Sequence, residues 1–157
     1  IIYRDDMNSC SLKRKSDLNL FTKSDIIIFA SNYSNQTCNI ELIKDSLFAN
    51  KTFFMGDKNF GHNLNWVMRV SKKDRSNLRN PLDIEYLKRE AKTKSYIPES
   101  NFISFFDSLV KNNQILITTD NGDLLSDDRS HLTLAGAKSV GKAVFKDSQI
   151  EIFFTRD

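Results

Sequence analysis

An aspartate and a histidine three positions apart are the residues of this sequence best suited to chemistry. They lie in the stretch 125–137, which reads LSDDRSHLTLAGA, as Asp128 and His131. A catalytic imidazole needs one nitrogen toward a nucleophile and the other held by a carboxylate, which fixes its tautomer. This pair could form the base half of a hydrolase triad. The same pattern also fits a loop whose aspartate caps a helix and whose histidine is merely exposed.

A helix is predicted directly after this pair. Thr133 is a favourable N-cap residue. The apolar positions that follow fall on one face at helical spacing, namely Leu134, Ala137, Gly141, Val144 and Phe145. His131 would therefore stand just before a C-terminal amphipathic helix.

The block Asp128-x-x-His131-Leu132-Thr133-x-x-Gly136-Ala137 resembles the last conserved block of the SGNH (GDSL-like) hydrolases. Its form is similar to that of SGNH domains associated with membrane O-acyltransferases that modify bacterial cell-surface polysaccharides. Upstream, 25–33 (DIIIFASNY) resembles the family's central strand and exit loop, and 102–109 (FISFFDSL) precedes the block at the usual interval. The resemblance runs from roughly Cys10 to Phe145.

The resemblance implies an α/β fold: a three-layer sandwich with a mostly parallel sheet, of the SGNH or flavodoxin-like type. It implies transfer of an acyl group, most simply acetyl, to a cell-surface carbohydrate, or hydrolysis of such an ester. His131 would be general base and then acid, and Asp128 its orienting carboxylate. Asn32 matches the family's oxyanion-hole asparagine, with Asn35 as a weaker alternative and a plain turn at 31–32 as another. This chemistry requires no metal or organic cofactor.

One element of the family pattern is missing. No Gly-Asp-Ser block occurs, and the nearest string, at 56–58, reads Gly-Asp-Lys. We therefore expect residues 1–157 to be a single SGNH-like domain, the C-terminal part of a longer chain, whose first strand and serine lie upstream or have been lost. Ser31 is an alternative nucleophile at a strand end, but it lacks the flanking glycines of a nucleophile elbow.

Apolar runs alternate with helical patterns along the chain, which favours βαβ units and a mostly parallel sheet. The predicted strands are 26–30, 52–55 and 102–106. One predicted helix presents Ile40, Ile43 and Leu47, and another, capped by Asp83, presents Ile84, Leu87 and Ala91.

The connection 57–81 has no clear period, and long loops of this kind are often functional. Tyr33, Phe60 and Trp66, with His62 beside them, are candidate residues for contact with an acyl or sugar group. Alternatively, Trp66 and Val67 pack the loop onto the core and His62 is exposed.

The charge and the apolar content of the sequence indicate whether a nucleic acid or a membrane is an expected partner. The formal charge is +3 over 157 residues, and acidic residues interrupt or flank the basic runs 13–15 and 88–94. No nucleic-acid partner is therefore expected. No stretch approaches the ~20 apolar residues of a membrane span. We expect an extracytoplasmic location if the chain is fused to a membrane acyltransferase domain upstream. Pairing of Cys10 with Cys38 stays open.

Two other functions fit parts of the pattern. One is a non-catalytic carbohydrate-binding or interaction domain that has lost the nucleophile. The other is a nucleotide-binding α/β module, which is weakened because no Gly-rich phosphate loop follows any predicted strand.

Overall fold

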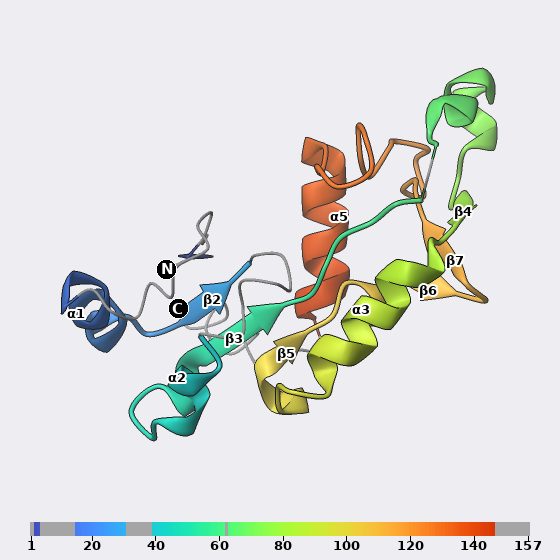
Figure 1. The fold of residues 1–157 in the computed structure, drawn as a ribbon. Helices are drawn as coiled ribbons and strands as arrows, with labels where there is room; N and C mark the ends of the chain where they lie inside the picture. The colour runs from blue at the N-terminus through green and yellow to red at the C-terminus, as the bar shows by residue number, and fades with distance from the viewer. Residues whose placement is uncertain (1, 4–14, 31–38, 62, 147–157) are drawn as a thin grey trace. The chain divides into compact units, whose positions relative to one another are not determined.

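The computed structural model describes residues 2–3, 15–30, 39–61 and 63–146 (Figure 1). The chain divides into two compact units. Unit 1 comprises Ile1–Asp57, Arg89–Ile103 and Gln149–Asp157, and unit 2 comprises Lys58–Lys88 and Ser104–Ser148. This division does not test the expectation that residues 1–157 form a single SGNH-like domain, which stays a prediction.

Unit 1 contains a parallel sheet. Its strands are β1 (Ile2–Tyr3), β2 (Ile27–Phe29), β3 (Thr52–Met55) and β5 (Phe102–Ile103), paired in that order. The predicted strands at 26–30 and 52–55 are confirmed. The third is shorter than predicted, because the chain turns into helix α4 (Phe106–Leu109) after 103. Spatial order follows chain order, so the described sheet lacks the reversal of order that marks a doubly wound fold.

Unit 1 also contains helices and a cluster of buried aromatic side chains. The helices are α1 (Lys15–Lys23), α2 (Glu41–Lys44), the short 3-10 helices η3 (Ala49–Lys51) and η6 (Glu99–Asn101), and the second half of α3 (Ile84–Lys94), which begins in unit 2. The Phe29 ring stacks on that of Phe54 with centroids 5.2 Å apart and meets that of Phe21 edge-on at 6.0 Å. All of β2 is buried, as expected for a strand covered on both faces.

Two side chains satisfy the carbonyl groups at the end of α1. The ammonium of Lys51 donates to the carbonyls of Phe21 at 2.8 Å, Thr22 at 3.1 Å and Ser24 at 2.8 Å. The Ser24 hydroxyl donates to the Leu20 carbonyl at 2.6 Å. Carbonyls in the last turn of a helix have no partner within it, so a cation there is favourable. Lys51 therefore ties α1 to the segment that leads into β3.

The predicted apolar face of α3 is wrong. Ile84 is 53% exposed and Ala91 is also exposed, whereas Glu90 and Thr93 are buried. The reason is Gly56, directly after β3, where a Cβ would lie 2.8 Å from Oε2 of Glu90. The glycine leaves room for this carboxylate, which Lys94 approaches to 3.5 Å. The helix therefore packs through a polar face.

Unit 2 contains an antiparallel sheet that the sequence did not predict. Its strands β4 (Arg79–Pro81), β7 (Gln114–Leu116) and β6 (Val110–Lys111) lie side by side in that order. Asn112 and Asn113 join β6 to β7 with φ of 52° and 57°, as in a tight hairpin turn. The described residues therefore form a mixed α/β structure, with one parallel and one antiparallel sheet.

The remaining elements of unit 2 are α4, α5 (Leu134–Phe145) and the 3-10 helices η4 (Asn65–Arg69) and η5 (Lys72–Asp74). Within the connection 57–81, the regular structure is limited to these two short 3-10 helices and β4, which agrees with its lack of a helical or strand period. None of the helices within the described part of the chain is long and apolar enough to cross a membrane.

The contacts of Lys51 give a stability prediction. We expect Lys51→Met to lower the free energy of unfolding by about 1–2 kcal/mol, because hydrogen bonds from an ammonium are lost while the aliphatic stem is kept. Urea unfolding followed by circular dichroism measures this. Lys73→Met, at an exposed position of η5, is the control. Equal midpoints for the two variants would contradict the capping role of Lys51.

Candidate active site

The loop that carries Asp128 and His131 connects two segments that extend the antiparallel sheet through backbone hydrogen bonds. Backbone hydrogen bonds run from Ile117 to the Leu78 carbonyl at 2.9 Å and from Leu125 to the Ile117 carbonyl at 2.9 Å. Thr133 continues the series, donating to the Leu125 carbonyl at 3.1 Å. Leu125 is fully buried. Both ends of the loop 126–132 are therefore fixed to the sheet.

Contacts between its two arms close the loop. Ser126 and Leu132 form an antiparallel bridge. The His131 carbonyl accepts the Ser126 hydroxyl at 2.7 Å and the Asp127 amide at 3.3 Å. The loop is therefore a tight hairpin with Asp128 and His131 at its tip.

The Asp128 carboxylate organises this tip. Its Oδ1 accepts the amides of Arg129, Ser130 at 2.7 Å and His131 at 2.9 Å. Amide donors stabilise the ionised carboxylate, and the amides of His131 and Ser130, with the His131 ring, hold the pKa of Asp128 far below its usual range. Asp128 is therefore ionised and acts only as an acceptor.

The second oxygen of this carboxylate meets the imidazole. Asp128 Oδ2 lies 2.6 Å from His131 Nδ1, with the two side chains 54% and 80% exposed. Because the carboxylate is an acceptor, Nδ1 carries the proton and donates it. In the neutral ring, Nε2 is then left with a lone pair on the side away from Asp128. This is the tautomer that can take a proton from a hydroxyl nucleophile.

Phe60 supports the loop through its backbone. The Phe60 amide donates to the Arg129 carbonyl at 2.9 Å, and the Phe60 carbonyl accepts Nδ2 of Asn80, in β4, at 3.0 Å. Its ring is 1% exposed and packs in the core. Contact between this ring and a substrate stays a prediction. The backbone role had no signal in the sequence, because it depends on main-chain groups.

The first turn of α5 packs against the base of the loop. Thr133 is the N-cap as predicted: its hydroxyl accepts the Gly136 amide at 2.8 Å and donates to the Leu124 carbonyl at 2.6 Å. A Cβ on Gly136 would overlap the Leu125 carbonyl oxygen. Only glycine allows this approach without displacement.

The predicted apolar face of α5 is wrong by about one position. The buried residues are Gly136, Val140 and Val144, whereas Leu134 is 75% exposed and Ala137 is also exposed. The close approach at Gly136 sets this rotation. Of the predicted face, Val144 is buried.

The structure describes some of the other residues named in the sequence analysis and leaves others outside its described part. Trp66 lies in η4 and is 36% exposed, beside Val67, which is fully buried. Gly56 and Asp57, from the string nearest to the missing Gly-Asp-Ser block, follow β3. Burial raises the pKa of the Asp57 carboxyl, and Arg89 partly opposes that shift. Several predicted residues lie outside the described part of the chain: Cys10, Ser31, Asn32, Tyr33, Asn35, Cys38 and His62.

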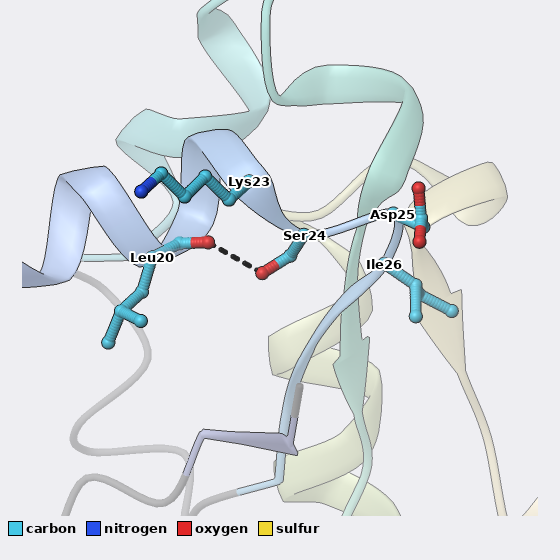
Figure 2. Close-up of a pocket in the computed structure, with 5 residues that line it drawn as sticks. All are labelled: Leu20, Lys23, Ser24, Asp25 and Ile26. Atoms are coloured by element: carbon cyan, nitrogen blue, oxygen red, sulfur yellow. Dashed lines mark hydrogen bonds between the residues drawn. The ribbon is translucent and has the colours of Figure 1, made fainter.

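An open pocket lies elsewhere, between the end of α1 and the start of β2 (Figure 2). It is lined by Leu20, Lys23, Ser24, Asp25 and Ile26. This is the amino end of β2, whereas ligands of parallel sheets bind at the carboxyl ends of strands. The pocket includes neither Asp128 nor His131.

Within the described segments, no group of at least three histidine, cysteine, aspartate or glutamate side chains could hold a metal ion.

Comparison with known proteins gives no relative: no family model matches the chain, and no significant match is found among curated proteins or solved structures.

Two glycines of α5 provide a matched test of the packing at the loop base. We expect Gly136→Ala to lower the free energy of unfolding by roughly 2 kcal/mol or more, because its methyl group displaces the Leu125 backbone. At Gly141 a Cβ would meet only the Phe145 ring, at 4.0 Å. Gly141→Ala should therefore stabilise the protein, by up to about 1 kcal/mol from helix propensity. Thermal melts of both variants measure this, and a stable Gly136→Ala would contradict the close approach.

The Asp128 carboxylate makes stability depend on pH. Its folded-state pKa lies below the unfolded value, so its stabilisation is present above about pH 4 and is lost as the pH falls further. We expect Asp128→Asn to lower stability near neutral pH and to differ less from wild type in acid. Urea unfolding at several pH values tests this. The control is Asp127→Asn, whose side chain makes none of these contacts, and a larger effect at Asp127 would contradict the assignment.

Proposed function

We propose that this chain is the acid and histidine part of an SGNH-type domain. The domain would transfer an acyl group, most simply acetyl, to a cell-surface carbohydrate, or hydrolyse such an ester. The observation that carries the proposal is the 2.6 Å contact between Asp128 Oδ2 and His131 Nδ1, with Nε2 turned away from the carboxylate. The loop held from both ends supports it, because a triad base must keep one orientation.

The proposed reaction passes through an acyl-enzyme. A serine from outside these 157 residues attacks the acyl carbonyl as its hydroxyl proton moves to Nε2 of His131. Asp128 stabilises the imidazolium, which then gives the proton to the departing alcohol. A sugar hydroxyl or water next loses its proton to Nε2 and takes the acyl group, and the proton returns to the serine. Transferase and esterase differ only in which acceptor enters.

Other parts of the domain complete the proposal. Asn32 would donate to the developing oxyanion, Tyr33 and Trp66 would contact the carbohydrate, and the buried Phe60 would support the loop of Asp128 and His131 through its backbone. The surface exposure of Trp66 is compatible with that role. We place the domain in a three-layer α/β fold, outside the cytoplasm where it is fused to a membrane acyltransferase. No metal or organic cofactor takes part in this mechanism.

A second candidate is a non-catalytic carbohydrate-binding domain. It is favoured by the absence of a Gly-Asp-Ser block and by the high exposure of the His131 ring. In such a domain, Asp128 would serve only to fold the loop.

Turnover of an aryl acetate by the domain including its serine block separates the two candidates. We expect His131→Ala to abolish turnover and Asp128→Asn to reduce it at least about tenfold, because an unoriented base loses its productive tautomer. Asp127→Asn is the matched control and should keep its activity. Thermal melts show whether each variant is folded.

Equal turnover by wild type and His131→Ala would contradict the assignment of the base. A serine-directed fluorophosphonate probe, applied to residues 1–157 alone, adds a second check. We expect no stoichiometric labelling, because the proposed nucleophile is not in this segment. Stoichiometric labelling mapped to Ser31, or to any other serine of this segment, would overturn the proposal of an external serine.

A further inference from the structure

We propose that Ser126 is a positioning residue for His131, holding through its hydroxyl the main-chain carbonyl of the residue that carries the imidazole. The expected effect on activity rests on the proposed function. The expected effect on the tautomer of His131 does not rest on the proposed function, because it follows from the geometry of the loop alone.

Little except hydrogen bonding determines where the His131 ring lies. The ring is 80% exposed, so core packing does not confine it. Its orientation depends on the contact between Nδ1 and Asp128 and on the main chain of His131. Any change in the main-chain torsion angles moves the ring relative to the carboxylate, which is itself fixed by backbone amides.

The two peptide planes beside the His131 Cα are held by different partners. On the amino side, the His131 amide donates to Asp128 Oδ1 at 2.9 Å. On the carboxyl side, the His131 carbonyl accepts the Ser126 hydroxyl at 2.7 Å, while the Asp127 amide is more distant at 3.3 Å. Ser126 is therefore the closer of these two restraints on the ψ angle of His131.

The Ser126 hydroxyl is well placed for this task. Ser126 is 0% exposed, so water does not compete for its hydroxyl, and the hydrogen bond forms in a region of low dielectric. Its backbone is anchored by the bridge to Leu132. A rigid and buried donor on one arm of the hairpin thus fixes an exposed residue on the other arm.

A buried hydroxyl can also contribute to stability alone, so the test needs a control that loses a hydroxyl without touching His131. Thr118 fits, because it is fully buried and its hydroxyl accepts the Leu78 amide at 2.8 Å and donates to the Arg75 carbonyl. Thr118→Val keeps the shape and removes these bonds. Ser126→Ala removes the hydroxyl at the proposed positioning residue.

The direct measurement is the tautomer of His131, read from nitrogen-15 correlation spectra of the imidazole rings at a pH where the ring is neutral. The His131→Ala spectrum identifies the signals. We expect wild type to show the Nδ1–H form, Ser126→Ala to gain a clear share of the Nε2–H form, and Thr118→Val to match wild type. In the domain that includes the serine, Ser126→Ala should lower kcat about fivefold with KM unchanged, as one net hydrogen bond implies.

Each outcome bears on one of the two proposals. If Ser126→Ala keeps the wild-type tautomer, or if Thr118→Val changes it equally, the positioning role is overturned. If the tautomer responds only to Ser126→Ala but the wild-type domain cleaves no ester, the positioning role stands and the proposed function fails.

Discussion

The negative charge of Asp128 is the constraint on which the candidate site depends. Consecutive amides of the turn point at one oxygen of this carboxylate, and the other oxygen meets the imidazole. Converging amide dipoles need an anion to be stable, and an imidazole needs an acceptor to hold its tautomer. One ionised group meets both needs. The folding of the loop and the orientation of its histidine therefore depend on the same carboxylate.

That carboxylate can act only because the base of the loop is rigid. The fully buried Leu125 lies between Ile117 and Thr133 in a series of backbone hydrogen bonds, and Gly136 brings α5 against it. Thr133 joins the loop to the helix by capping it. The position of the exposed hairpin tip is thus determined by core contacts at the two ends of the loop. In the absence of those contacts, the entropy of the loop would oppose a single geometry.

Sequence reasoning succeeded where spacing alone determines structure. The pairing of Asp128 with His131, the cap at Thr133 and the strands β2 and β3 all follow from local pattern. It failed where contacts with segments distant in the sequence determine which residues are buried. The buried faces of α3 and α5 are set by Glu90 over Gly56 and by Gly136 against Leu125. The antiparallel strands have only two or three residues each, too few for a period to appear.

The exposure of the pair explains why backbone amides carry so much of its geometry. In water, a surface carboxylate and imidazole attract each other weakly, and salt weakens the attraction further. Amides fixed in a turn lose little entropy when they bind the carboxylate, so they hold it where an exposed ion pair alone would not. Developing charge is best stabilised where water is excluded. In the proposed reaction, the bound acyl substrate must therefore itself displace water from the Nε2 side of His131, while Asp128 and Ser126 keep the ring in place.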